Sequence, residues 1–313
     1  MPPLAPGTSR PLMVVCLAVV WVLWGSVYLG IRLVINEVDP FQAMAQRFLL
    51  AGLLLAVIVT VRRGPGALRV TRPQLKSLIL TGALLLGFGN GLQALAQVNG
   101  LPSGVTALVV AAVPAWAVLL RLLLGDRPPP LTVAGVVVGF GGMVALVLLG
   151  QGVGESLPVI GVVLCLASSL SWTVGSYLQG VIDLPADAFV IATYQQLVAC
   201  GCSVLLAVAD GEGFSMAYST RGWLALIYLV VACSIVAFLA FTWLLTHVPL
   251  SLTATHAYIN PVVAVVLGWA ILSEPIGSPV LIGGGLVVAS VMLVVSAERR
   301  PVVAEEPAGV LGA

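Results

Sequence analysis

The chain alternates long apolar segments with short polar ones. Ten segments each hold about 20 mainly apolar residues, the length that an α-helix needs to cross a bilayer. They cover roughly Leu12–Ile31, Phe41–Val61, Ser77–Val98, Gly104–Leu124, Leu131–Leu149, Val159–Leu178, Ala188–Ala209, Trp223–Leu245, Leu252–Leu272 and Val280–Ser296. The strict alternation of a membrane β-barrel is not seen in these segments. The pattern therefore predicts an all-α integral membrane protein with ten transmembrane helices.

Composition supports a membrane protein. Of the 313 residues, 60% are hydrophobic and 8% are charged, and the mean hydropathy is +1.14. Soluble domains carry about 25% charged residues, so we expect a lipid bilayer around this chain. The net charge of +1 leaves no extended basic face, and no nucleic-acid partner is expected. The first apolar segment is too long for a signal peptide and lacks a small-residue cleavage site, so we expect it to be retained.

The basic residues indicate an orientation. If there are ten spans, ten of the thirteen Lys and Arg residues fall on one side of the membrane. Arg32 and Arg221 fall on the other side, and Arg47 lies inside a span. Because Lys and Arg concentrate in cytoplasmic loops, we expect both termini in the cytoplasm. The protein is then a multi-pass protein of the cell inner (plasma) membrane.

The second half of the chain repeats the first. The segment "LPSGVTALVVAAVPAWAVLL" aligns without a gap on "VPLSLTATHAYINPVVAVVL", so that Pro114 matches Pro261. Trp24 and Trp172 match at nearly the same offset. Two five-span halves are therefore predicted. Their limits are 12–149 and 159–296, with short cytoplasmic tails at 1–11 and 297–313.

An odd number of spans in each half has a consequence for topology. A duplicate of five spans enters the membrane from the opposite side, which makes an inverted repeat. Transporters built this way place their substrate near the middle of the membrane, between the halves, and expose it to each side in turn. We therefore expect a secondary transporter that works by alternating access.

Two sets of segments carry a family resemblance. "VLWGSVYLGIR", "AQRFLLAG", "PSGVTALVVAAVPAWAVLL" and "GVVVGFGGMVALVL" resemble one repeat of the EamA family, in the drug/metabolite transporter superfamily. "SWTVGSYLQG", "TYQQLVA", "INPVVAVVLGWAILSEP" and "IGGGLVVASVMLV" resemble the second. The resemblance covers nearly the whole chain. It implies ten helices, cytoplasmic termini, a central cavity and, in many members, export of amino acids or related metabolites.

The chain departs from the family pattern at two places. The fourth span ends in Gly125-Asp126, where the family often has Gly-Glu, and the Trp-Gly-Ser motif of the first half is loosened to "WTVGS" in the second. The resemblance does not select a substrate. A nucleotide-sugar or sugar-phosphate exchanger and a scaffold without transport stay open as alternatives. The lack of a deep Lys disfavours phosphate-bearing substrates.

Aromatic residues near the middle of the spans are the first candidates for substrate contact. Tryptophan in membrane proteins usually lies at the interfaces, yet Trp24, Trp116 and Trp172 lie near mid-span. Tyr28 is one turn beyond Trp24 on the same face. The repeat places Trp24 and Trp172 opposite each other. We expect all four to bind substrate, with core packing as the alternative.

Two polar stripes are the second group of candidates. Their members are three and four positions apart and share one helix face: Asn90, Gln93 and Gln97 in the third span, and Thr253, His256 and Asn260 in the ninth. A polar group in hydrocarbon costs several kcal/mol without a partner. We expect Asn90, Gln93, His256 and Asn260 to face a cavity and bind substrate. Hydrogen bonding between helices is the alternative.

Two prolines and one arginine are predicted to have gating or structural roles. Pro114 and Pro261 remove an amide hydrogen and free the carbonyls of Val110 and Ala257, which favours kinked helices beside a cavity over kinks for packing alone. Arg47 lies about two turns into the second span. We expect its side chain to extend to the outer surface and bond helix ends or the outer gate.

Several kinds of chemistry are not expected. The five cysteines all lie in spans and predict packing rather than a disulfide framework or metal site. No carboxylate lies in a span core, and no Walker loop, His-Glu-x-x-His or Gly-x-Ser-x-Gly motif occurs. We expect no enzyme, cofactor or metal. His256 is the one deep base near neutral pH, so proton coupling is open beside simple hydrogen bonding.

Small residues at four-residue spacing suggest close helix contacts. Gly135 and Gly139 in the fifth span, and Gly285 and Ala289 in the tenth, show this spacing. They are expected to pack the scaffold or a partner subunit, so a homodimer is one alternative. The other expected partners are the bilayer and a small-molecule substrate.

Overall fold

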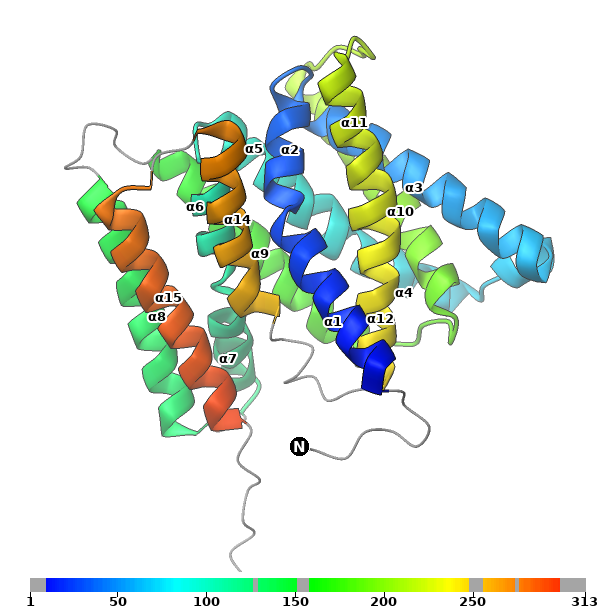
Figure 1. The fold of residues 1–313 in the computed structure, drawn as a ribbon. Coiled ribbons are helices and arrows are strands. Elements are labelled where there is room, and N and C mark those ends of the chain that lie inside the picture. Colours follow the sequence, from blue (N-terminus) through cyan, green and yellow to red (C-terminus); the bar gives the residue numbers. More distant parts are fainter. Residues whose placement is uncertain (1–9, 126–128, 151–157, 248–255, 274–275, 299–313) are drawn as a thin grey trace, which may run out of the picture.

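The computed structural model describes residues 10–125, 129–150, 158–247, 256–273 and 276–298. Every regular element in these ranges is a helix (Figure 1), which confirms the all-α prediction. The first half holds α1 (Arg10–Gly25), α2 (Val27–Ile35), α3 (Pro40–Arg63), η1 (Pro65–Leu68), α4 (Arg72–Gly82), η2 (Ala83–Phe88), α5 (Gly89–Val98), α6 (Ser103–Val110), α7 (Val113–Leu123) and α8 (Pro130–Gly150). The second holds α9 (Val159–Gln179), α10 (Ala188–Asp210), α11 (Thr220–Tyr228), η3 (Leu229–Ala237), α12 (Phe238–His247), α14 (His256–Leu272) and α15 (Ser278–Glu298).

Within the described ranges, 7 helical segments are long and apolar enough to cross a membrane. Shorter apolar helices lie at the three remaining predicted spans: Pro130–Gly142, Val262–Leu272 and Val280–Ser290. The start of α1 and the end of α15 lie on the same side of the bundle (Figure 1), as an even number of crossings requires. That the chain crosses the membrane ten times stays a prediction.

Helices in matching places of the two halves pack against each other. α3 lies along α10, α8 lies along α15, and α6 contacts α14. α1 contacts η3 and α12, while α9 contacts η2 and α5, so the pattern is preserved when the halves are exchanged. A shared pattern of contacts is what a duplicated unit is expected to form.

α3 and α10 run antiparallel. Arg63 at the end of α3 pairs with Asp187, which directly precedes α10. At the other end, the backbone amide of Phe41 donates to Glu212, just after α10. Two equivalent helices in opposite directions are what an inverted repeat requires.

A π-helical stretch interrupts each of two matching segments. η2 and η3 are both π-helices, and wide turns of this kind often occur at functional sites. Their carbonyls accept side-chain hydrogen bonds from the other half. Trp24 Nε1 donates to the Cys233 carbonyl in η3 at 3.4 Å, and Ser171 Oγ donates to the Leu84 carbonyl in η2 at 2.8 Å. The π-helices thus join the halves at equivalent points.

The first span is divided at Ser26, between α1 and α2. The Ser26 hydroxyl donates to the Leu23 carbonyl at 3.0 Å and lies 2.5 Å from the Tyr228 hydroxyl. Gly25 lets this region approach α14, because a Cβ there would lie only 2.6 Å from the Val263 Cβ. The Trp-Gly-Ser motif therefore has a packing role.

The helix is interrupted before the proline of the fourth span but is continuous at the proline of the ninth. α6 ends at Val110 and α7 begins at Val113, so a break precedes Pro114 rather than the expected kink. Proline fits the first turn of a helix because amides there need no helical partner. α14 instead runs on through Pro261. The side chains of both prolines, and all of Thr253, lie outside the described residues.

The small residues of the fifth span have a partner within the chain. A Cβ on Gly139 would lie 2.3 Å from Ser290 Oγ in α15. Gly139 therefore permits the close contact of α8 with α15. Of the two expected roles for this residue, the structure supports packing of the scaffold.

Candidate substrate-binding site

A cavity of about 80 Å³ lies between the two halves. Seven of the eight predicted substrate-binding residues line it: Trp24, Tyr28, Asn90, Gln93, Trp172, His256 and Asn260. They come from α1, α2, α5, α9 and α14. Residues of the two polar stripes and the repeat-equivalent tryptophans therefore line the same cavity.

Aromatic rings form one wall of this cavity. The rings of Trp24 and Trp172 meet edge-on, with centroids 5.7 Å apart and an interplanar angle of 89°. The two repeat-equivalent tryptophans therefore face each other, as predicted, and are in direct contact. Trp24 also contacts Phe241 at 4.6 Å and His256 at 5.3 Å between centroids. Such an aromatic wall favours an apolar part of a solute.

Arg47 lies on the polar wall. Its Nε donates to Ser234 Oγ at 2.8 Å, and its Nη1 donates to Asn90 Oδ1 at 3.2 Å. The residue is only 4% exposed, so the prediction that its side chain reaches the outer surface is wrong. The reason is that the start of α3 is itself covered, since Phe41 and Gln42 bond to Glu212. The guanidinium turns inward instead.

Gln196 was missed by the sequence analysis. It lines the cavity from α10, and its Nε2 donates to the Ser234 carbonyl at 2.9 Å. That bond fixes the orientation of the amide, because only nitrogen can donate to a carbonyl. The Oε1 atom is buried and has no hydrogen-bond partner in the described part of the chain. The resemblance had marked the segment "TYQQLVA", but not which glutamine faces inward.

Asn260 has both cavity and structural contacts. It lines the cavity. With its amide nitrogen toward two backbone carbonyls, it donates to His256 O at 3.1 Å and to Trp21 O at 3.2 Å. It thereby connects α14 to α1, so the alternative of hydrogen bonding between helices applies in part.

Two residues of the predicted patterns do not line the cavity. Trp116 Nε1 donates to Ser169 Oγ at 2.8 Å, and its ring meets Phe140 edge-on at 6.0 Å. Gln97, the last member of the first stripe, is fully buried, and its side-chain amide has no partner among the described residues. The backbone carbonyl of Gln97 accepts a hydrogen bond from Arg32 Nη1. Both residues lie away from the candidate site.

A hydrogen-bonded network joins the halves at the start of α3. The Glu212 carboxylate accepts the backbone amides of Phe41 at 3.1 Å and Gln42 at 2.8 Å. Negative charge at a helix N-terminus is favourable. Gln46 Nε2 donates to the Ser215 carbonyl at 2.8 Å. We call this network the α3 entry cluster; its members are Glu37, Phe41, Gln42, Gln46, Glu212, Ser215, Tyr218 and Ser219.

The remaining contacts of the α3 entry cluster involve Tyr218 and Glu37. Tyr218 donates its hydroxyl to Gln46 Oε1 at 2.7 Å. Burial raises the pKa of Tyr218 to about 12, so the hydroxyl stays a donor at neutral pH. Glu37 accepts from the Ser219 amide at 2.7 Å and hydroxyl at 2.6 Å. Burial also raises the pKa of Glu212, opposed by the amides of Gln42 and Phe41.

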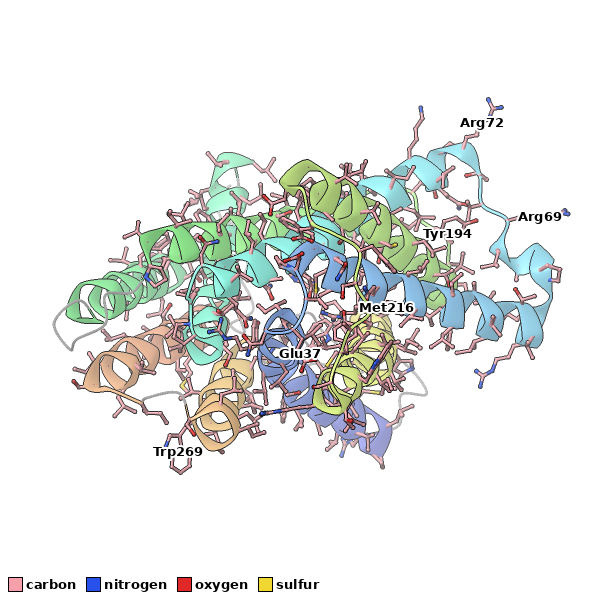
Figure 2. All side chains as sticks on the ribbon, turned by 90° about the horizontal axis from the view of Figure 1, so that it is seen from above. Glu37, Arg69, Arg72, Tyr194, Met216 and Trp269 are labelled. Atoms are coloured by element: carbon pink, nitrogen blue, oxygen red, sulfur yellow. The ribbon has the colours of Figure 1, made fainter. Side chains whose placement is uncertain are left out.

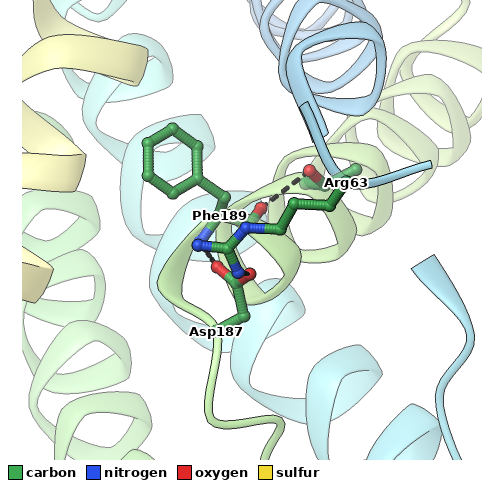
Figure 3. Close-up of polar contacts among 4 residues, drawn as sticks. Arg63, Asp187 and Phe189 are labelled. Carbon is green, nitrogen blue, oxygen red and sulfur yellow. Dashed lines mark hydrogen bonds and ion pairs between the residues drawn. The ribbon is translucent and has the colours of Figure 1, made fainter. Parts of the chain in front are cut away.

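The opposite end of α3 and α10 has sparser contacts. Figure 3 shows Asp187 between the Arg63 guanidinium and the backbone of Phe189. The Asp187 carboxylate accepts the Phe189 amide at 2.9 Å and caps α10. The Arg63 side chain is 60% exposed. Arg69 and Arg72 project outward at this edge, whereas Glu37 and Met216 lie over the middle of the molecule (Figure 2).

These features define a class of protein. Seven of the described helical segments are long and apolar enough to cross a membrane, and a small cavity with an aromatic wall and a polar wall lies where two similarly packed halves meet. The sequence profile of the EamA-like transporter family matches residues 11–148 and again 159–296. The chain belongs to the EamA-like transporter family.

Curated relatives agree with this assignment. The chain is 33% identical over 289 residues to the uncharacterized inner membrane transporter YedA of Escherichia coli, covering 91% of this chain and 92% of the relative. It is 28% identical over 283 residues to the uncharacterized transporter YvbV of Bacillus subtilis, covering 89% and 90%. It is 26% identical over 285 residues to a probable terminal-alkyne amino-acid exporter of Streptantibioticus cattleyicolor, covering 87% and 90%.

A solved crystal structure shows the same fold. It superposes with a TM-score of 0.65 at 22% identity, covering 93% of this chain and 99% of that chain. Together with the apolar helices, the comparisons establish a membrane transporter fold and agree with a protein that is not an enzyme.

Proposed function

We propose that this protein is a secondary transporter that moves small organic metabolites across the cytoplasmic membrane by alternating access, with export of amino acids or related solutes. The observation that carries the proposal is the cavity between the halves, which residues of both halves line. In two-gated transporters a site at such a position can be exposed to either side.

The antiparallel arrangement of α3 and α10 supports the mechanism. Equivalent helices of opposite direction agree with two inverted five-helix repeats, at 12–149 and 159–296. Such repeats give the two membrane faces equivalent gates. The protein then lies in the inner membrane of the cell. Because basic loops usually lie on the cytoplasmic side, both termini are in the cytoplasm.

Cavity size and charge support small solutes over phosphate-bearing ones. A volume of about 80 Å³ is well below the roughly 300–1,000 Å³ of pockets for drug-sized ligands. This volume favours a small solute over a nucleotide sugar. Among the described lining residues Arg47 is the one permanent cation, whereas a phosphate group is better held by several. One relative is named a probable terminal-alkyne amino-acid exporter, which also supports a small solute.

Transport into proteoliposomes tests the proposal. The purified chain is reconstituted and loaded with labelled amino acids and other small metabolites, and efflux is compared with empty liposomes. Ala111 lines the cavity, so Ala111→Phe is expected to fill it and reduce transport to the level of empty liposomes. Leu53 is 50% exposed on the surface of α3 and does not line the cavity, so Leu53→Phe is the matched control and is expected to keep wild-type rates.

Two results would count against the transporter proposal. One is that no solute of a broad panel moves faster than through empty liposomes. The other is that Ala111→Phe folds normally and transports as fast as Leu53→Phe. Either result would favour a scaffold that does not transport.

A further inference from the structure

An open groove lies on the surface where α3, α10 and α12 come together. It has a volume of about 440 Å³ and is lined by Val57, Ile58, Val61, Arg62, Phe189 and Leu239. It shares no residue with the lining of the cavity between the halves. All its lining residues except Arg62 are apolar, and Val57 and Val61 are 58% and 80% exposed. Hydrocarbon is therefore the favoured neighbour of this surface.

Arg62 is the polar residue of the groove. It lies in the last turn of α3, directly after Val61, so a cation follows the apolar lining. The residue is exposed, and within the described ranges it makes no ion pair. An arginine at the end of a membrane-spanning helix lies at the level of the lipid headgroups. Its planar donors fit the oxygens of a phosphate group.

The groove continues into a segment rich in positive charge. We call residues 62–76 the basic turn. It holds no acidic residue, and its exposed basic residues are Arg62, Arg63, Arg69, Arg72 and Lys76. The Tyr194 hydroxyl donates to the Leu68 carbonyl at 2.7 Å and so holds the basic turn against α10. Figure 2 shows Arg69 and Arg72 pointing away from the bundle.

One carboxylate balances part of this charge. Asp187 pairs with Arg63, and in the described part of the chain this is the one ion pair of the basic turn. Arg62, Arg69 and Arg72 thus keep their charge without an acidic partner there. Each Lys or Arg close to an anionic lipid surface strengthens binding about fivefold. The basic turn is therefore complementary to a headgroup that carries a net negative charge.

We propose that the groove and the basic turn together bind an anionic phospholipid. One acyl chain lies along Val57, Val61 and Leu239, and the lipid phosphate accepts hydrogen bonds from Arg62. The other basic residues select a negative headgroup over a zwitterionic one. A free phosphate would use the cations but would leave the apolar groove uncovered, so the occupant is a lipid. The site lies outside the central cavity, and binding there does not require that any solute is transported.

Competition between two lipids tests this proposal on the purified full chain in detergent. Equal amounts of anionic dioleoylphosphatidylglycerol and zwitterionic dioleoylphosphatidylcholine are added, and native mass spectrometry counts the bound lipids. Because the acyl chains are identical, the ratio reports on the headgroup. Phosphatidylglycerol is expected to bind at least about tenfold more tightly, since several unpaired arginines each add about fivefold. Glycerol 3-phosphate, which has no acyl chain, should displace neither lipid at the same concentration.

Two variants with matched controls locate the lipid. Arg62→Gln is expected to reduce the preference for phosphatidylglycerol about fivefold. Arg10→Gln removes the same charge from an exposed residue outside the groove and should leave the preference nearly unchanged. Val57→Trp fills the groove and should weaken both lipids about fivefold. Leu53→Trp, at a 50% exposed position of α3 outside the lining, should bind both as wild type does. Thermal unfolding checks that each variant is folded.

Four results would overturn the proposal. Equal binding of the two lipids would mean that headgroup charge has no part in it. An effect of Arg10→Gln as large as that of Arg62→Gln would assign the preference to the overall charge of the protein. Unchanged lipid binding by Val57→Trp would remove the groove from the site. Displacement of the lipid by glycerol 3-phosphate would show a site for soluble anions instead.

Discussion

The two ends of the α3–α10 pair are held by different chemistry. At the start of α3, the α3 entry cluster combines a carboxylate on helix amides with several neutral hydrogen bonds between the halves. At the other end, an exposed ion pair joins Arg63 and Asp187. The Tyr194 hydroxyl also donates a hydrogen bond to the Leu68 carbonyl at 2.7 Å. One end is a partly buried network, and the other consists of a few isolated contacts.

If the protein works by alternating access, as proposed, this difference predicts which end opens first. Exposed ion pairs contribute about 0–1 kcal/mol, whereas each hydrogen bond to a charged group contributes about 1.5–3 kcal/mol. In an alternating-access mechanism, this conformation is then closed at the α3 entry cluster. Opening at the Arg63 end requires the smaller change in free energy.

Glu212→Ala is expected to have the largest effect. The amides of Phe41 and Gln42 lose their acceptor, which costs about 2 kcal/mol or more and lowers the unfolding temperature by several degrees. Glu212→Gln keeps one acceptor oxygen, so its unfolding temperature should fall less than that of Glu212→Ala. Thermal unfolding of the purified protein measures both. Equal stability of wild type and Glu212→Ala would show that the cluster does not hold this end.

The pH dependence of Glu212 sharpens the same point. Burial raises its folded pKa, so the folded state binds the proton more tightly than the unfolded state. Stability from this group is then fully present below the unfolded pKa and falls as pH rises through the raised value. Unfolding temperature is expected to fall over that acid window in wild type and to be flatter in Glu212→Gln. The same slope in both would assign the effect to another group.

Much of the candidate site could be predicted from the sequence. The repeat offset placed Trp24 opposite Trp172, and the contact exists. The spacing of Asn90 and Gln93 placed both on one face, and both line the cavity. Periodicity and duplication carry this information because a polar face in lipid must turn inward.

The missed features depend on which helices are neighbours. Gln196 and Ser234 meet because α10 lies beside the π-helix η3, and a widened turn has no marker in the hydrophobic pattern. The depth of Arg47 was inferred from its distance to a helix end. That estimate failed because the α3 entry cluster covers the end. Trp116 lay at mid-span but bonds Ser169, which the repeat alone could not show.

Tyr218→Phe should have a smaller effect than Glu212→Ala. It removes one neutral hydrogen bond, from the hydroxyl to Gln46, and is expected to cost about 1 kcal/mol. Chemical denaturation or thermal unfolding measures the loss. A loss as large as that of Glu212→Ala would mean that the carboxylate is not the main contact of this end.

Arg63→Ala is expected to have the smallest effect, about 0.5 kcal/mol or less, because the ion pair is exposed. Asp187→Ala serves as its comparison. Asp187 also caps α10 through the Phe189 amide, and loss of a cap costs about 1 kcal/mol. Asp187→Asn keeps a capping oxygen and should resemble Arg63→Ala. If Arg63→Ala were as destabilising as Glu212→Ala, the two ends would be equally strong.

Distances across both ends, measured on one protein, test alternating access most directly. Spin labels are placed on exposed positions, at Asp39 and Ala217 beside the α3 entry cluster and at Arg62 and Ala186 at the opposite end, after replacement of the half-buried Cys200 and Cys202. Distances are recorded without and with a saturating transported solute. The account predicts reciprocal changes, one pair lengthening as the other shortens. Distances that stay fixed, or change in the same direction, would contradict it.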